Sequence, residues 1–272
     1  MTRLDDRPDF ELSRDYVQSL ARGIAVLRAF DRDHPRMSLA AIAARSGLSR
    51  AAARRLVLTL QHLGYVRATG REFTLSPRVL DLGFGFVGSL NLTDLVQPLM
   101  EDLTRRVDES CSMAVLDGQS IVYVARVPVR KVMTVSLGVG AQLPAYCTSL
   151  GRALLAGLNE AALVAWLKAC KPVRRTEHSI TDRSELRRAV DEVRSQGFSY
   201  VEQELELGLC SVAVPVRNRQ GRVAAALNIG MRFDSDARAR AFEVLAPALQ
   251  QTAAAIERST PPDWLPPVTG AA

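Results

Sequence analysis

Two short helical patterns flank a glycine turn between residues 38 and 63, and this arrangement constrains the fold most. Ser38 is placed to cap an Ala-rich helix. Gly47 supplies the backbone freedom of a sharp corner, and Ser49 caps a second helix that Gly64 ends. The segment therefore predicts two helices joined by a tight turn.

Flanking patterns complete a small domain around this segment. A helix is predicted from near Tyr16, because apolar residues recur on one face at three- and four-residue spacing (Val17, Leu20, Ile24, Leu27). After the second helix, short strands at 65–68 and 72–75 flank Thr69-Gly70-Arg71, which indicates a hairpin. This order is typical of a winged helix-turn-helix, which we place at residues 16–77, behind a disordered tail at 1–15.

Positive charge is concentrated in the same part of the chain. Residues 1–77 hold 13 Arg, no Lys and 8 carboxylates, whereas the rest holds 22 basic and 21 acidic residues. No carboxylate lies between Asp33 and Glu72, a stretch with seven Arg. An acid-free basic segment is typical of a surface that binds phosphates. A general use of Arg for solvated cations explains the preference over Lys, but not the missing acids.

A helical projection of the second helix separates an apolar face from a basic one. The residues expected to face the core are Ala52, Leu56, Leu60 and Leu63. Arg50 and Arg54 project the other way, and Leu58 also points outward. Arginine pairs bidentately with guanine, and a small neighbour permits close approach. The predicted DNA-binding residues are Ser38, Ser49, Arg50, Ala51, Arg54, Arg55 and Thr59 on the helices, with Arg67 and Arg71 on the hairpin. The alternative is a merely solvated basic face.

The remaining sequence mixes strand and helix patterns. Pro77 opens an apolar helix that we interpret as a linker at residues 78–92, packed between domains or against a second subunit. Beyond it, strands are predicted at 112–116, 120–127, 132–137, 199–206, 212–216 and 223–231, and helices at 148–158, 160–168, 184–195 and 237–257. The pattern predicts an α+β domain at 93–258, with helices on the faces of an antiparallel sheet, and a disordered tail at 259–272.

Catalytic and metal-binding motifs are missing from the sequence. It contains no G-x-S-x-G, H-E-x-x-H or P-loop, and its four Cys form no C-x-x-C pair. His178 lies in a polar loop pattern, and Cys147 has no base nearby in the sequence. We therefore expect no enzyme, no metal and no cofactor. No apolar run approaches the ~18 residues of a membrane span, and the first thirty residues resemble no secretory signal, so we expect a cytoplasmic protein.

A small-molecule site is indicated in the C-terminal half. A Gly- and Pro-rich loop runs into a helix near Thr148, whose free N–H groups suit a carboxylate. Asn228 alternates with Gly230 along a buried strand, where a polar side chain needs a loop or a ligand as its partner. Three alternating glutamates would share one face of a strand, most simply a solvated one (Glu202, Glu204, Glu206).

From about residue 16 to 257 the sequence resembles the IclR-type transcriptional regulators. The matching stretches are SLARGIAVLRAF, LAAIAARSGLSRAAARRLVLTLQHLGYV, FTLSPRVLDLG, LPAYCTSLGRALLA and QELELGLCSVAVPV. The stretches SRAAARR and QELELGLCSVAVPV are most similar to the PcaR/PcaU/PobR branch. Members of that branch regulate the breakdown of protocatechuate and 4-hydroxybenzoate through the β-ketoadipate pathway.

The resemblance implies a winged helix joined to a GAF-like effector domain. It implies that a homodimer or homotetramer binds a palindromic double-stranded operator, with Arg50 and Arg54 reading bases. It also implies a pocket for a small carboxylate effector, lined by Val132, Val135, Ser149, Leu150, Glu202 or Glu204, Cys210 or Ser211, Asn228 and Gly230. Tyr146 stands where a His is common in relatives, which changes the size or polarity near the pocket. The Cys and His cluster that holds a metal in some relatives has no counterpart here.

Two other classes of function stay open at this point. An enzyme or metabolite-binding domain with a vestigial winged helix would turn over a small acid without salt-dependent DNA binding. A protein-interaction module would use the winged helix to bind an acidic partner. Activation and repression use the same two sites, so the residues favour neither.

Overall fold

The computed structural model describes residues 14–31, 33–83, 95–129 and 138–260. The chain divides into two compact units, Met1–Phe86 and Val87–Ala272. The predicted strand at 132–137 lies outside the described residues, as do nearly all of the two predicted tails. Of the predicted linker, only 78–83 is described; a 3-10 turn covers Pro77–Leu80, and 81–83 are helical.

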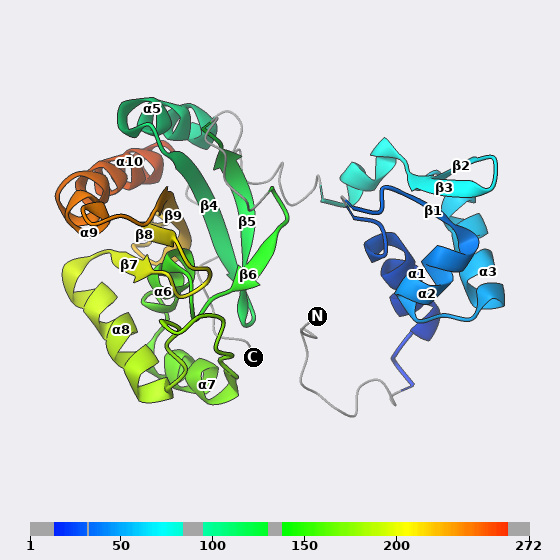
Figure 1. Ribbon diagram of the computed structural model, residues 1–272, viewed down its shortest axis with the longest axis horizontal. Coiled ribbons are helices and arrows are strands. Elements are labelled where there is room, and N and C mark those ends of the chain that lie inside the picture. Colours follow the sequence, from blue (N-terminus) through cyan, green and yellow to red (C-terminus); the bar gives the residue numbers. More distant parts are fainter. Residues whose placement is uncertain (1–13, 32, 84–94, 130–137, 261–272) are drawn as a thin grey trace. The chain divides into compact units, whose positions relative to one another are not determined.

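The N-terminal unit is a helix-turn-helix with a small antiparallel sheet (Figure 1). Its elements are α1 (Gln18–Arg28), β1 (Arg36–Ser38), α2 (Leu39–Ser46), α3 (Arg50–His62), β2 (Val66–Thr69) and β3 (Glu72–Leu75), with strand order β1-β3-β2. The Ser38 and Ser49 hydroxyls each accept a backbone N–H at 3.3 Å, from Ala41 and Ala52. Gly47 ends α2 in the left-handed region, with φ of 66°. The predicted caps, turn and hairpin are therefore confirmed.

The buried face of α3 is displaced from its projection. Of the predicted set, Leu60 is buried and Leu56 packs partly buried against the core, but the fully buried positions are Ala53 and Val57 rather than Ala52. Leu63 is 47% exposed, because the helix ends one residue earlier and the projection no longer applies.

Most of the apolar face predicted for α1 points into solvent, although Leu27 packs partly buried against the core. Its exposed members are Val17, Leu20 and Ile24. The core of the unit forms instead around Val26 and Phe30, which pack with Ile42 and Val57. The spacing thus identified a helix, but its most regular apolar stripe is not the side that packs in this unit.

The C-terminal unit is built on one six-stranded antiparallel sheet (Figure 1). Its strands are β4 (Ser110–Asp117), β5 (Ser120–Val127), β6 (Gln142–Pro144), β7 (Ser199–Glu202), β8 (Leu209–Arg217) and β9 (Val223–Arg232), in the order β6-β5-β4-β9-β8-β7. One face packs against α5 (Gln97–Val107), α9 (Ala237–Arg240) and α10 (Ala246–Ser259). The other packs against α6 (Ser149–Leu155), α7 (Glu160–Ala169) and α8 (Arg183–Gln196). The predicted α+β class is confirmed.

Local signals located most of these elements. Asp117 and Gly118 lie at the turn between β4 and β5, with Gly118 at φ 56°. The predicted closing helix is α9 and α10 joined through a π-helical segment, Ala241–Leu245. Two three-residue strands, β1 and β6, were not predicted. Within the described part of the chain, no helix is both long and apolar enough to cross a membrane.

Candidate DNA-binding surface and effector site

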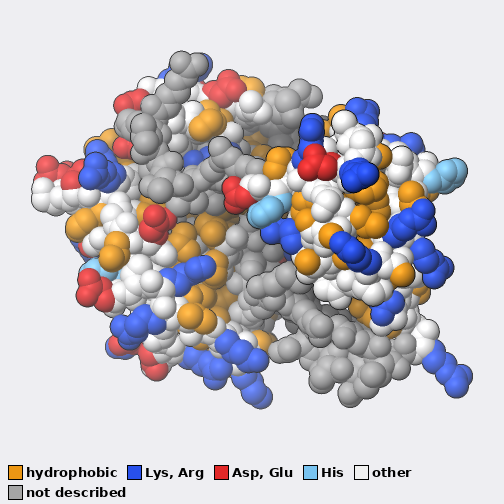
Figure 2. Space-filling view, turned by 45° about the vertical axis from the view of Figure 1, so that its right-hand side comes forward, with side chains coloured by type: hydrophobic (Ala, Val, Ile, Leu, Met, Phe, Trp, Pro, Cys, Tyr) orange, Lys and Arg blue, Asp and Glu red, His pale blue; other side chains and the backbone are white. Residues whose placement is uncertain are grey.

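Cations on α3 and the hairpin are free of acidic partners. Two arginines of the acid-free segment are paired: Arg45 bonds Asp31 at 2.5 Å, and Arg36 lies 3.9 Å from Glu72. The other five are exposed, and no described carboxylate lies within 4 Å of them (Arg50, Arg54, Arg55, Arg67, Arg71). Figure 2 shows basic side chains spread over the N-terminal unit, at the right of that view. These unneutralised charges are available to an anionic partner.

Hydroxyl groups of the predicted DNA-binding set have local roles. Those of Ser38 and Ser49 cap α2 and α3, which leaves each hydroxyl proton free to donate elsewhere. The exposed Thr59 hydroxyl donates to the Arg55 carbonyl oxygen at 2.9 Å. Ala51 is exposed at the start of α3, beside Arg50. Whether these groups touch DNA stays a prediction.

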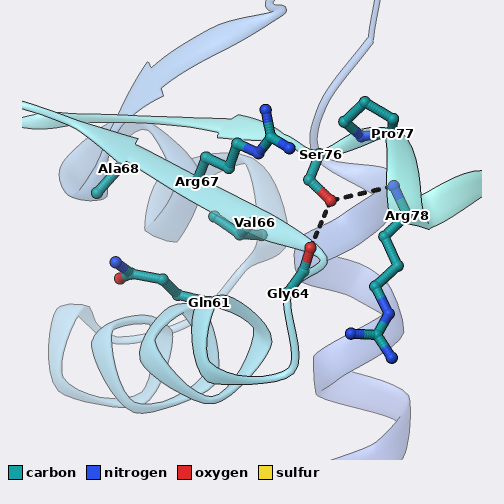
Figure 3. Close-up of a pocket in the computed structure, with 8 residues that line it drawn as sticks. All are labelled: Gln61, Gly64, Val66, Arg67, Ala68, Ser76, Pro77 and Arg78. Carbon is teal, nitrogen blue, oxygen red and sulfur yellow. Dashed lines mark hydrogen bonds between the residues drawn. The ribbon is translucent and has the colours of Figure 1, made fainter.

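An open hollow of about 560 Å³ lies between the end of α3 and the base of the hairpin (Figure 3). Gln61, Arg67 and Arg78 line it from α3, β2 and the start of the linker. The Ser76 hydroxyl bonds the Gly64 carbonyl oxygen and accepts the Arg78 N–H, which fixes the linker's first turn to the end of α3. Of the two arginines, Arg78 already lies 3.8 Å from the Asp81 carboxylate and over the Tyr65 ring, which leaves Arg67 as the unpaired cation among the described residues at the hollow.

A cluster of polar side chains lies on the face of the C-terminal sheet that packs on α6. Ser112 on β4 lies opposite Arg126 on β5 and opposite Asn228 on β9. Residues opposite each other in an antiparallel pair project from the same face. Arg126 Nη1 donates to the Ser112 hydroxyl at 3.4 Å. Burial raises the pKa of the Tyr123 phenol to about 12, while the Arg126 guanidinium acts in the opposite direction.

A hydrogen bond between two hydroxyls ties α6 to the same face of the sheet. The Ser149 hydroxyl donates to that of Ser211 at 2.8 Å, and Ser211 lies opposite Gly230 on β9. Leu150 is buried beside them in the core shared with α7 and α8. Thr148 caps the helix by accepting the Gly151 N–H at 3.2 Å. The predicted pocket residues Ser149 and Leu150 thus lie on α6, and Ser211, Asn228 and Gly230 lie on the face of the sheet against which α6 packs.

Other predicted pocket residues lie elsewhere. Cys210 faces the opposite core, where its Sγ lies 3.6 Å from the Met231 carbonyl oxygen. Glu202 lies opposite Cys210 in the β7–β8 pairing and accepts the Tyr200 hydroxyl at 2.9 Å. These two residues thus lie on the wrong face for a pocket beneath α6, because successive strand residues alternate between faces. Val132 and Val135 lie outside the described residues.

Glu204 does not continue the strand. β7 ends at Glu202, and Gln203 has φ of 56°, so the three glutamates do not share one face as predicted. The Glu204 carboxylate is buried and bonds the Arg152 guanidinium of α6 at 2.7 Å. It also accepts the Ile180 N–H at 3.1 Å. One carboxylate oxygen, Oε2, thus joins α6 to the loop before α8, so Glu204 has a structural role.

Sequence reasoning missed Ser112, Tyr123 and Arg126. The sequence did hold one indication of Arg126, which is the one charged residue of the largely apolar strand predicted at 120–127. Its meaning depends on the face it occupies, which only the pairing with Ser112 establishes.

Within the described residues, neither a metal-binding cluster nor an activated cysteine nucleophile is found. No three His, Cys, Asp or Glu side chains among them come together as a metal site. The four cysteines are free and buried, and burial raises the pKa of Cys147 to about 11. A thiol with such a pKa is almost wholly protonated at neutral pH.

Comparison with known protein families finds IclR domains along most of the chain. The IclR helix-turn-helix domain matches residues 19–70, and the bacterial transcriptional regulator IclR C-terminal domain matches 84–258. The chain is 41% identical to the Pca regulon regulatory protein of Pseudomonas putida, over 79% of this chain and 74% of that one. It is 36% identical to the p-hydroxybenzoate hydroxylase transcriptional activator of Acinetobacter baylyi, over 79% and 82%.

Solved structures similar to this chain include regulators of the same family. A transcriptional regulator from Rhodococcus sp. RHA1 matches with 47% identity and a TM-score of 0.79, over 90% of this chain and 98% of that one. An IclR homolog from Microbacterium hydrocarbonoxydans, complexed with 4-hydroxybenzoate, matches with 26% identity and a TM-score of 0.78, over 89% and 98%. With a winged helix, an α+β effector domain and relatives of this similarity, the chain belongs to the IclR family of bacterial transcriptional regulators.

Proposed function

We propose that this chain regulates genes for aromatic-acid breakdown, in the route of protocatechuate and 4-hydroxybenzoate through the β-ketoadipate pathway. Its effector domain, at residues 93–258, binds a small aromatic acid. Its winged helix, at 16–77, binds the operator. The names of the Pca and p-hydroxybenzoate relatives support this pathway, as does the related structure that holds 4-hydroxybenzoate.

The observation that carries the effector proposal is the position of Arg126. Its guanidinium lies beside the Ser112 hydroxyl on the face where α6 places Ser149. A guanidinium is the side chain best suited to a carboxylate, because it donates two parallel hydrogen bonds. The Ser149–Ser211 hydroxyl pair and Asn228 supply the neutral donors and acceptors that a ring hydroxyl needs. The pocket residues are thus Arg126, Ser112, Tyr123, Ser149, Leu150, Ser211, Asn228 and Gly230.

The operator surface is the exposed face of α3. Arg50 and Arg54 bind base edges in the major groove, and Arg55 binds phosphate. Arg67 and Arg71 of the hairpin bind the flanking groove and backbone. The acid-free character of this surface supports the assignment. Since the protein acts on DNA, we place it in the cytoplasm.

The active form is a homodimer, or a homotetramer made of two dimers, on a palindromic operator. Two-fold pairing is the usual way in which a helix-turn-helix binds two half-sites. The exposed apolar stripe of α1 supports contact with a second copy of the chain (Val17, Leu20, Ile24). The linker at 78–92 transmits the effector signal by changing the spacing of the paired winged helices.

Calorimetric titration with 4-hydroxybenzoate and protocatechuate tests the effector site. Arg126→Gln removes the guanidinium and keeps a polar side chain, so affinity should fall about 10- to 100-fold, as expected for the loss of hydrogen bonds to a charged group. Arg188→Gln is the matched control, because Arg188 of α8 is 74% exposed and far in the sequence from the predicted pocket. It should bind like the unmodified protein.

Equal affinity in Arg126→Gln and Arg188→Gln would remove Arg126 from the pocket. Chemical conversion of either acid by the purified protein would favour the enzyme alternative. Binding to DNA that lacks any sequence preference or salt dependence would favour an acidic protein partner.

A further inference from the structure

Leu58 occupies an unusual position on α3. It is 43% exposed, and it does not join the core of its unit. Burying a leucine is favourable by ~1.5–3 kcal/mol, so an exposed one on a helix otherwise rich in polar groups forgoes a gain that a small domain could use. Its neighbours on the helix surface are Arg54, one turn before it, and Arg55.

Leu58 lies opposite the buried side of α3. At about 100° per residue, Leu58 and Ala51 fall within about 20° of each other and about 130–150° from the middle of the buried set. That buried set is Ala53, Val57 and Leu60. Leu58 and Ala51 therefore form an apolar line on the outward side of the helix, next to Arg55.

Arginines border this apolar line on both sides. Arg54 and Arg55 project about 50° to either side of it. Ala51 and Leu58 are about 10 Å apart along the axis, which corresponds to about three base-pair steps. A helix that enters a major groove along this line presents Leu58 directly to base edges, while the arginines flank it.

We propose that Leu58 is a sequence-specificity residue that contacts the 5-methyl group of a thymine in the operator. This inference rests on the proposed DNA-binding function. The thymine methyl is the one apolar group that base pairs offer in the major groove. Leucine neither donates nor accepts a hydrogen bond, so any other base edge against it would lose water without a replacement partner. Leu58 thus favours thymine and disfavours cytosine, whose amino group needs an acceptor.

Uracil substitution tests this contact, because uracil differs from thymine only by the methyl. DNA sites are first selected from a random pool by the full-length protein. Each thymine of one half-site is then replaced singly by uracil, and Kd is measured by fluorescence anisotropy. We expect one thymine whose replacement weakens binding about fourfold, the effect of one buried methyl group. Leu58→Ala should bind the thymine and uracil sites equally.

Leu63→Ala is the matched control. Leu63 has a similar exposure, 47%, but it follows the end of α3 and projects to another side. This variant should keep the fourfold preference for thymine. Leu58→Ala should stay folded by circular dichroism, since the side chain is outside the core and alanine favours a helix.

Three outcomes overturn the inference. A thymine preference that survives Leu58→Ala assigns the methyl contact to another residue. The absence of any uracil effect removes the contact itself. A change in self-association of Leu58→Ala, with thymine preference intact, makes Leu58 a contact between protomers. If the unmodified protein selects no sequence at all, the proposed DNA-binding function fails, and that result is distinct from the other three.

Discussion

Single residues of the acid-free segment differ in role according to their neighbours. Arg45 joins α2 to the end of α1 through Asp31 and the Ala29 carbonyl oxygen, whereas Arg36 only lies 3.9 Å from Glu72 at the surface. Arg50 and Arg54 have no such partner in the described part of the chain, and they lie at the exposed start of α3. The distinction between a structural and an available arginine comes from pairing, which composition alone does not reveal.

Replacing Arg54 by alanine should relax operator preference at one base position. We expect a loss of about 1–3 kcal/mol on the selected site, since one bidentate contact to a base is worth that much. Affinities for a panel of sites, each with one changed base pair, measure this effect. A uniform loss across the panel would instead make Arg54 a phosphate contact. Arg188→Gln, in the other unit, should leave every site unchanged.

The four cysteines should be unreactive in the native protein. Burial raises the pKa of Cys147 and of Cys170 to about 11, and all four thiols are buried. At pH 8 the thiolate fraction is therefore small, and reagent access is limited. Labelling with a thiol reagent should be slow until denaturant unfolds the chain. Rapid native labelling of Cys147 would contradict this and would reopen the nucleophile hypothesis.

At the scale of elements, close contacts hold α6 and the residues that follow it in place. A Cβ at Gly151 would lie 2.0 Å from the Ala145 carbonyl oxygen, and one at Gly157 would lie 2.3 Å from Val223 Cβ. The buried Arg152–Glu204 pair adds a third attachment. Because Ser149 and Leu150 begin this helix, these close contacts position the α6 side of the proposed effector site.

Gly151→Ala should therefore destabilise the effector domain. Alanine normally favours a helix, but here the backbone must shift to accommodate its methyl group, so we expect a loss of about 1–3 kcal/mol. Urea denaturation with effector-domain fluorescence measures the change. The control is Gly138→Ala, where a Cβ meets nothing within 4 Å. Equal stability of the two variants would show that α6 has room to move.

Elements fixed by short-range signals were predictable, and their faces were less so. Ser38, Gly47, Ser49 and Gly118 each mark a cap or turn by local chemistry, and the structure has them at those positions. β8 and β9 are buried on both faces, so apolar alternation cannot say which side an individual residue takes. For this reason the sequence left Cys210 and Ser211 as alternatives, of which Ser211 faces α6.

The features that the sequence did not predict depend on contacts between residues far apart in the chain. The Arg152–Glu204 pair joins residues 52 positions apart, and no spacing rule anticipates it. Arg126 gained meaning only through its cross-strand partner Ser112. In α1, the regular apolar stripe predicted the helix correctly but not that the stripe faces solvent in this unit.

At the scale of the whole molecule, charge and chemistry are divided between the two units. Residues 1–77 hold the excess of arginine over carboxylates, while basic and acidic residues nearly balance in the rest. The candidate acid-binding residues lie in the C-terminal unit. A regulator built this way must couple two separate sites, and such coupling is reciprocal, because binding free energies form a closed cycle.

The most direct test measures that cycle on the full chain. Kd for selected operator DNA is determined with and without 4-hydroxybenzoate or protocatechuate, and Kd for the acid is determined with and without DNA. We predict that one acid changes DNA affinity about 5- to 150-fold and that DNA changes acid affinity by the same factor. The DNA affinity should also fall steeply with salt, as phosphate contacts require. Specific binding of both ligands with no mutual effect would contradict the account.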